Sequence, residues 1–315
     1  MCALLGPLRK LLFGIPAKEI AFERRGFRGG EAGMRARLEQ IGQAFVWGYH
    51  AALADPDLAA LAPRLNFCER EWQGFAFEGA AMGLALLDFI TPWRRDRVSS
   101  FLQGAGGAHA YMVHVGAGWL LARTPGRVER RLARFDPLLR WLVVDGYGFH
   151  EGFFRWPRCV GGGPAPARLT GYARRAFDQG FGRCLWFIDG GDVARIPQSI
   201  LAFPAERRAD LWSGVGLAAT YAGGVGAREL EVLRDTAGSH RPCLAQGAAF
   251  AAKARQRGGN VMAGTELACA SLCGLSADAA ARITDVARED LPPDGAEPAY
   301  ELWRKRVQEK LARVA

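Results

Sequence analysis

Three segments of the chain repeat one local pattern, a polar residue and a glycine followed, three residues later, by a phenylalanine. They are QGFAFEGAAM at 73–82, DGYGFHEGFF at 145–154 and QGAAFAAKAR at 246–255. Each follows a helical pattern rich in small residues (45–53, 111–123 and 210–222) and then a short charged segment. The common order predicts three degenerate units, each a helix, a short helix and a second helix.

The glycines restrict the fold further. The chain has 40 glycines, and glycine inside a helix costs about 1 kcal/mol relative to alanine. Small residues on one helix face let a neighbouring backbone approach closely, and repeated helix pairs bury such faces against one another. Alternatively, the glycines could border a channel for a slender ligand. Both interpretations are compatible with the pattern.

We therefore predict an all-α fold, a helical-repeat-like array with little or no sheet. Residues 1–32 are expected to pack on the body as an N-terminal segment, and 291–315 to form a linker and an amphipathic helix. A single repeat domain would occupy 33–290, with units near 33–103, 105–200 and 201–290. The middle unit is longer because it holds an added helix near 171–187.

Composition limits the class of protein. The formal charge of +9 fits either an anionic partner or an arginine-rich solvated surface. Seven dispersed cysteines are typical of reduced thiols in the cytoplasm. No window has the character of a transmembrane span, and we expect the first 13 residues to pack on the protein rather than on a membrane. No pattern indicates nucleic-acid binding, and no cofactor can be assigned.

Aligning the three segments on Phe77, Phe149 and Phe250 places Glu78, His150 and Ala251 at equivalent positions. A histidine and a carboxylate near apolar walls can act as acid and base or bind a metal, although a histidine hydrogen-bonded within a core is the more ordinary outcome. We take as candidate catalytic residues Glu78, His150 and Glu151, and as candidate substrate-binding residues Gly74, Phe77, Gly146, Tyr147, Phe149 and Phe153. A speculative metal site would add His50 and His114.

A second pair of carboxylates lies in CLWFIDGGDVARIP at 184–197. Asp189 and Asp192 flank two glycines and are weaker catalytic candidates. The same residues are typical of a helix that stops at glycine and is followed by an aspartate cap, which we favour.

Three strings carry a resemblance to a known family: GFAFEGAAMGLALLDF at 74–89, DGYGFHEGFF at 145–154 and GFGRCLWFIDGGDVARI at 180–196. From Gly6 to Asp290 the chain resembles the UnbL-type proteins of bacterial enediyne biosynthesis clusters, a family of unknown molecular function. The resemblance implies a cytoplasmic protein of antibiotic secondary metabolism. Its expected partners are an iterative polyketide synthase, an UnbV-type protein and a membrane protein through which it could be membrane-associated. The family supplies no catalytic residues to transfer.

Two functions follow from this resemblance. In the first, the protein is an enzyme, or part of an enzyme complex, that acts on the linear polyene made by the synthase during formation of the enediyne core. Dehydrogenation, isomerisation and cyclisation would all fit. In the second, it is a non-catalytic helical-repeat adaptor or carrier that binds the intermediate or docks the synthase and a membrane partner. The residues alone also fit an all-α protein without a recognisable activity.

Overall fold

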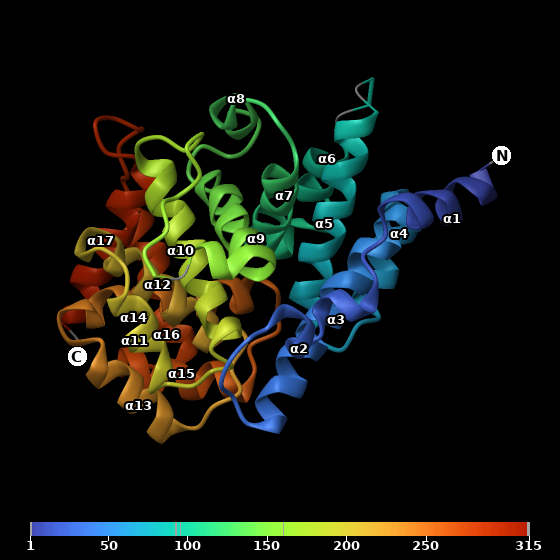
Figure 1. The fold of residues 1–315 in the computed structure, drawn as a ribbon. Helices are drawn as coiled ribbons and strands as arrows, with labels where there is room; N and C mark the ends of the chain where they lie inside the picture. The colour runs from blue at the N-terminus through green and yellow to red at the C-terminus, as the bar shows by residue number, and fades with distance from the viewer. Residues whose placement is uncertain (1, 92, 95, 160, 314–315) are drawn as a thin grey trace.

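The structure is a computed structural model, and it describes residues 2–91, 93–94, 96–159 and 161–313. Within these ranges every regular element is helical and none is a strand, which confirms the predicted all-α fold. Figure 1 shows a body of long helices from which α1 projects at the N-terminus. The long helices of the body are α3 (Ala32–Ala54), α5 (Gln73–Ile90), α7 (Ala110–Arg123), α9 (Trp141–Cys159), α10 (Tyr172–Ile188), α12 (Ala205–Tyr221) and α14 (Arg241–Arg257).

Shorter helices and 3-10 turns (η) connect or cover the long ones. They are α1 (Cys2–Phe13), η1 (Ala17–Ile20), α2 (Phe22–Arg25), α4 (Leu58–Asn66), α6 (Arg97–Gln103), η2 (Gly107–His109), α8 (Val128–Leu132), α11 (Arg195–Leu201), α13 (Ala227–Thr236), η3 (Gly238–His240), α15 (Ala263–Cys273), α16 (Ala277–Arg288) and α17 (Ala299–Ala312). Local sequence explains several of their ends. The side chains of Asp57 and Ser276 cap α4 and α16 by accepting hydrogen bonds from backbone N–H groups, and Gly274 ends α15 with a φ of +67°.

The long helices pack in chain order. α3 lies on α5, α5 on α7, α7 on α9, α9 on α10, α10 on α12 and α12 on α14. The order long helix, short helix, long helix occurs in α3–α4–α5, α7–α8–α9 and α12–α13–α14, while α10 lies between the second and third sets. The unit and domain boundaries drawn from the sequence stay a prediction.

Glycines lie at the crossings between these helices. A Cβ atom on Gly148 would lie 2.0 Å from the carbonyl oxygen of Phe177, and one on Gly180 would lie 1.8 Å from that of Asp145. Equivalent contacts with the backbone of the adjacent long helix are made by Gly48, Gly79, Gly116, Gly118, Gly146, Gly182, Gly214, Gly216 and Gly247. The predicted close approach of neighbouring backbones is therefore confirmed, because an alanine at these positions would overlap main-chain atoms.

The array curls until its last helices meet its first. Arg37 on α3 donates a hydrogen bond to the carbonyl of Ala222, just after α12, at 2.7 Å. Arg255 on α14 donates from Nη1 to the carbonyl of Glu71, just before α5, at 2.8 Å. The result is a ring of helices around a common interior.

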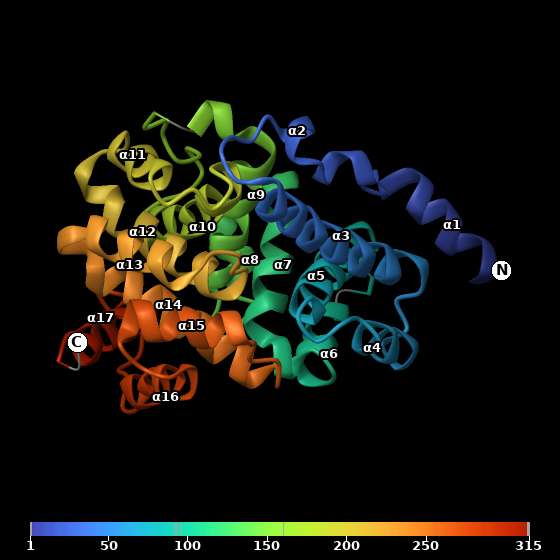
Figure 2. The ribbon, with the colours of Figure 1, turned by 90° about the horizontal axis from the view of Figure 1, so that it is seen from below.

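The two ends of the chain complete this ring. The segment 14–31 lies against the end of α10, where the backbone N–H of Arg28 donates to the carbonyl of Ile188 at 2.6 Å. At the other end, α17 packs on α14 and α16, and the rings of Trp303 and Phe250 are 4.4 Å apart. Figure 2 shows α1 and α4 at one end of the molecule and α16 and α17 toward the other.

The helix crossings correct the sequence alignment of the first unit. Gly79, not Gly74, makes the inter-helix backbone contact that Gly146 and Gly247 make, and Gly74 instead faces the hydroxyl of Tyr221. In this register Glu78 is equivalent to Asp145 and Gln246, each directly before its glycine. Glu78 and His150 are therefore not equivalent positions, because the alignment on phenylalanine was displaced by five residues in the first copy.

Two helices bear on the membrane question. α5 is long and apolar enough by composition to span a bilayer, but 67% of it is buried inside the protein, as in a core helix of a soluble protein.

α1 packs on the end of α3, where Gly6 meets the backbone of Ala54. Its opposite face carries Leu5, Leu8, Leu11 and Leu12, which are 42–82% exposed. The expected packing of α1 on the body therefore holds for one face only.

Candidate functional site

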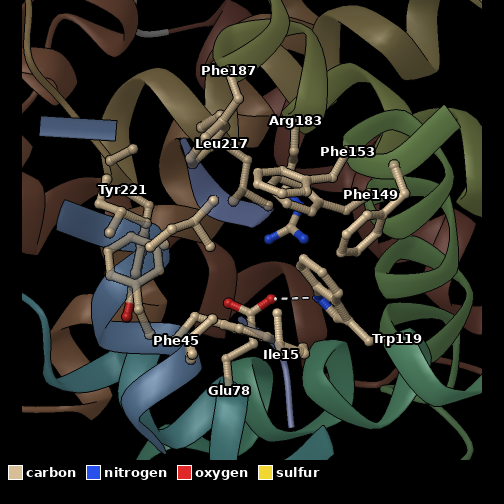
Figure 3. A pocket seen from close by; sticks show the side chains of 18 residues that line it. Ile15, Phe45, Glu78, Trp119, Phe149, Phe153, Arg183, Phe187, Leu217 and Tyr221 are labelled. Carbon is tan, nitrogen blue, oxygen red and sulfur yellow. Dashed lines mark hydrogen bonds between the residues drawn. The ribbon is translucent and has the colours of Figure 1, made fainter. Parts of the chain in front are cut away.

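A cavity lies inside the ring of helices. About 640 Å³ of space free of protein atoms, open solvent included, lies among its lining residues. Its walls are almost wholly aromatic and aliphatic, and Glu78 and Arg183 are its charged residues (Figure 3). The lining residues are Ile15, Ile20, Ile41, Gly42, Phe45, Val46, Phe75, Glu78, Trp119, Phe149, Phe153, Phe154, Arg183, Phe187, Leu217, Ala218, Tyr221 and Ala222.

Glu78 is held at the crossing of α5 and α7. Its carbonyl oxygen packs against Gly116, and its side-chain Oε1 accepts a hydrogen bond from the indole N–H of Trp119 at 3.0 Å (Figure 3). Burial raises the pKa of Glu78 to about 7, and the positive charge of Arg183 and the bond from Trp119 only partly offset this effect. Near neutral pH the carboxyl group is therefore present in both protonation states.

Arg183 enters from α10 on the opposite wall. Its guanidinium group points toward the carboxylate of Glu78 across the cavity (Figure 3). Its Nε lies 2.9 Å from Oδ1 of Asp145, and its Cζ lies 4.9 Å from the ring centre of Phe149. Asp145 is fully buried, and desolvation raises the pKa of its carboxyl group even though Arg183 and Gln179 favour the charged form. The cavity thus has one acidic and one basic side chain on facing walls.

Buried polar side chains precede the crossing glycines on five helices. They are Glu78, Asp145, Gln179, Ser213 and Gln246. Gln179 donates to Oδ2 of Asp145 at 2.8 Å, and Ser213 donates to Gln246 at 2.9 Å. Two hydrogen-bonded pairs therefore connect four of these groups, and Glu78, the fifth, is bonded to Trp119 and lines the cavity.

A second compartment lies toward α14 and α17, with about 420 Å³ of space free of protein atoms, open solvent included. Arg183, Leu217 and Tyr221 line both compartments, so these three side chains form the partition between them. The second compartment's other lining residues with polar groups are Asp145, Tyr111, Tyr300 and Trp303, and the rest of its wall is apolar. The interior therefore continues beyond the partition.

The sequence-predicted residues divide between this cavity and other places. Glu78, Phe149 and Phe153 line the cavity. Phe77 points into a separate small core, where its ring lies 5.6 Å from that of Phe101. Gly146 packs against the backbone of α7 at the α7–α9 crossing, and Gly74 faces the hydroxyl of Tyr221. The hydroxyl of Tyr147 accepts a hydrogen bond from Arg168 at 3.0 Å. Among the candidate glycines, neither one lines the cavity.

His150 and Glu151 are paired with each other beside the cavity and are not among its lining residues. Nε2 of His150 accepts a hydrogen bond from Arg123 at 2.9 Å, and Nδ1 lies 3.2 Å from Glu151. Burial lowers the pKa of His150. Burial also acts to raise the pKa of Glu151, but the hydrogen bonds and charges of His150 and Arg155 outweigh it and lower that pKa. The arrangement fits a neutral histidine held within the structure.

Asp189 and Asp192 have local partners. Asp189 accepts hydrogen bonds from Arg28 at 2.7 Å and Ser199 at 2.6 Å, which fastens the N-terminal segment to the end of α10. Oδ1 of Asp192 accepts from the backbone N–H groups of Ala194 and Arg195 at 3.0 and 3.2 Å. Gly190 and Gly191 have φ of +61° and +68° and follow the end of α10. The segment therefore ends a helix at glycine and caps the next turn with Asp192, as the sequence favoured.

The speculative metal ligands lie at different sites. His50 accepts a hydrogen bond from the backbone N–H of Ile15 at 3.1 Å, and Nδ1 of His114 lies 2.6 Å from the carbonyl of Ala110. Over the described residues, no group of three or more His, Cys, Asp or Glu side chains is placed to hold a metal ion.

Sequence reasoning missed Trp119, Arg183 and Tyr221. Arg183 could have been found, because it is the only charged residue in the apolar run FGRCLWFI at 181–188. The repeated polar residue before a glycine would also have identified Glu78 and Asp145 together. No local pattern marks Trp119 or Tyr221, since their place in the wall depends on closure of the ring.

Fold and site together define a class of protein: an all-α ring of glycine-packed helices that encloses an apolar cavity with a buried carboxyl group and a facing guanidinium. The chain belongs to the family described as Protein of unknown function (DUF1702), whose model matches residues 4–311. No match to the chain was found among curated proteins or among solved structures.

Proposed function

We propose that the protein binds a slender unsaturated chain in the cavity and that Glu78 transfers a proton to or from it. The observation that carries this proposal is a buried carboxyl group with a pKa of about 7 on the wall of an apolar cavity. A general acid or base works best when its pKa lies near the working pH, and an apolar pocket with few polar groups suits an apolar substrate.

The reaction class follows from the groups available. Glu78 can give a proton to one carbon of a conjugated chain and recover a proton from another, which shifts double bonds without any further reactant. Phe45, Phe149 and Phe153 line the cavity together with that group, which is itself buried. Proton-transfer isomerisation, or a cyclisation started by it, is therefore the chemistry that we propose.

The resemblance to UnbL-type proteins supplies the substrate. We propose that the chain is the linear polyene made by an iterative polyketide synthase, and that the protein acts in the cytoplasm with the synthase, an UnbV-type protein and a membrane protein during formation of the enediyne core. The narrow aromatic interior supports a polyene of this kind, because its walls can pack along a flat conjugated chain.

The experiment incubates the protein and its two expected neighbours with the synthase-derived polyene and follows the products by mass spectrometry. Glu78→Gln keeps an oxygen that can accept the bond from Trp119 but removes the transferable proton, and it should abolish conversion. Glu151→Gln is the matched control, since Glu151 is also buried but lies outside the cavity lining. Circular dichroism verifies folding. Full conversion by folded Glu78→Gln, or loss only in Glu151→Gln, would refute the proposal.

The non-catalytic adaptor is the second candidate, and α1 favours it. Its exposed stripe of Leu5, Leu8, Leu11 and Leu12 is a face suited to an apolar partner. In the adaptor function, replacing Leu8, Leu11 and Leu12 by serine should release the protein from the membrane fraction of cells that also make the membrane neighbour. Unchanged fractionation, with polyene conversion intact, would argue against docking through α1.

A further inference from the structure

Arg183 is a buried cation with unused hydrogen-bonding capacity. Its side chain is 7% exposed. Nε lies 2.9 Å from Oδ1 of Asp145, within ion-pair distance, but neither Nε nor Nη2, both of them buried, has a hydrogen-bond partner among the described residues. The terminal nitrogens point into the cavity (Figure 3). An unpartnered buried donor of this kind is unfavourable on its own, and it needs an acceptor that the protein does not supply.

The facing carboxyl group is not that acceptor. The ion pairs found in the described part of the chain include Arg183 with Asp145 but not Arg183 with Glu78. Glu78 is already oriented by Trp119, and its charged form is disfavoured by burial. The space between the two side chains belongs to the cavity, so an entering ligand can reach both of them.

We propose that Arg183 binds the carboxylate of an unsaturated long-chain acid whose apolar part lies along the aromatic wall. Because the Nε side of the guanidinium faces Asp145 at 2.9 Å, the edge formed by the two terminal nitrogens is left for the two oxygens of a ligand carboxylate. The stacking of Arg183 on Phe149 fixes that edge in one orientation. This inference rests on the proposed function and specifies its substrate class as a free acid rather than a hydrocarbon, ester or alcohol.

Binding of an anion here has a consequence for Glu78. The titratable groups that line the two compartments are Glu78 on α5, Tyr111 on α7, Asp145 on α9, Arg183 on α10, Tyr221 on α12 and Tyr300 on α17. Asp145 and a bound carboxylate would both be paired with the guanidinium of Arg183. A charged Glu78 would then be a third, unpaired negative group, so ligand binding should be accompanied by uptake of a proton on Glu78.

The test uses all-trans-parinaric acid, a conjugated tetraene acid whose fluorescence rises in apolar surroundings, together with its methyl ester. The wild-type protein should bind the acid at least tenfold more tightly than the ester. Arg183→Met should remove this preference, lowering the affinity for the acid at least tenfold while leaving the ester within about twofold. Arg97→Met is the matched control, because Arg97 is a buried ion-paired arginine outside the cavity lining and should keep the preference.

Calorimetry in two buffers of different ionisation enthalpy at pH 7.5 measures proton uptake. Wild type should take up a substantial fraction of a proton with the acid, and Glu78→Gln should take up none. Equal affinity of wild type for acid and ester overturns the carboxylate inference whether or not any variant folds, and it leaves the proposed function standing. If neither probe binds, and the uncharged rod diphenylhexatriene does not bind either, the proposed function fails as well.

Discussion

Replacing Gly247 by alanine isolates the contribution of the close helix crossings. A Cβ at this position would lie 1.9 Å from the carbonyl oxygen of Ser213 and 2.7 Å from the backbone nitrogen of Leu217, where ordinary contacts begin at 3.4 Å. The obstructing atoms belong to the backbone of α12. Relief therefore requires α14 to move away by about 1.5 Å, which a close-packed interior resists.

Two opposing contributions determine how much Gly247→Ala changes the free energy of unfolding. Alanine has the better helix propensity and would gain up to about 1 kcal/mol. Overpacking of a core costs about 1–3 kcal/mol, and a rigid backbone contact belongs at the upper end of that range. The net loss should be about 2 kcal/mol, which lowers the Tm by about 3 °C, because the entropy of unfolding grows with the 315 residues of the chain.

Thermal unfolding followed by circular dichroism measures this change. Gly264→Ala in α15 is the control, because a Cβ there meets nothing within 4 Å, and its Tm should stay within about 1 °C of wild type or rise. If Gly247→Ala unfolds at the wild-type temperature or above it, the glycines are not required for close approach and the account of the ring is wrong.

Three further perturbations test other parts of the structure. Burial raises the pKa of Glu78 from 4.5 to about 7, so the folded state holds its proton more tightly than the unfolded chain does. Stability is therefore lost as pH rises from 4.5 through 7, by about 3 kcal/mol, and Glu78→Gln should lack this loss in urea titrations at pH 5 and pH 8. If the free energy of unfolding depends on pH identically in wild type and Glu78→Gln, the raised pKa of Glu78 is contradicted. Arg304 is buried and lies 2.6 Å from Asp210 and 3.0 Å from Glu301. Arg304→Ala should lower the free energy of unfolding by about 3–5 kcal/mol, whereas Arg282→Ala, in an exposed pair, should lower it by at most about 1 kcal/mol. Equal losses in guanidinium chloride unfolding would show that burial of the ion pair does not matter. Leu11→Ser on α1 should leave the Tm within about 2 °C of wild type, because Leu11 is 82% exposed; a larger fall would mean that α1 is covered in solution.

The all-α fold was predictable because its signals are local. Glycines, small residues and helical periodicity repeat along the chain, and each can be recognised without knowledge of the rest. The register of the first unit was not predictable in the same way. Gly74 and Gly79 both precede suitable helical residues, and only the contact of Gly79 with Phe45 on α3 distinguishes them.

The candidate site was predicted in part. Glu78, Phe149 and Phe153 were identified and do line the cavity. His150 was an attractive candidate because its residue type suits acid–base chemistry, but its ring nitrogens already lie against Arg123 and Glu151. Arg183 was overlooked because a single arginine in an apolar helix has no periodic signature. Its role depends on Glu78 lying across the cavity, which is a relation between α5 and α10.

The position of α17 has a consequence for synthesis on the ribosome. Tyr300 and Trp303 form a wall of the second compartment, and Arg304 supplies the cation that binds Asp210 and Gln246. α12 and α14 are translated before α17, so the buried acceptors on a nascent chain have no partner until Arg304 has been made. Products of premature termination before residue 304 would retain that defect permanently, and quality-control proteases should remove them as unfolded chains.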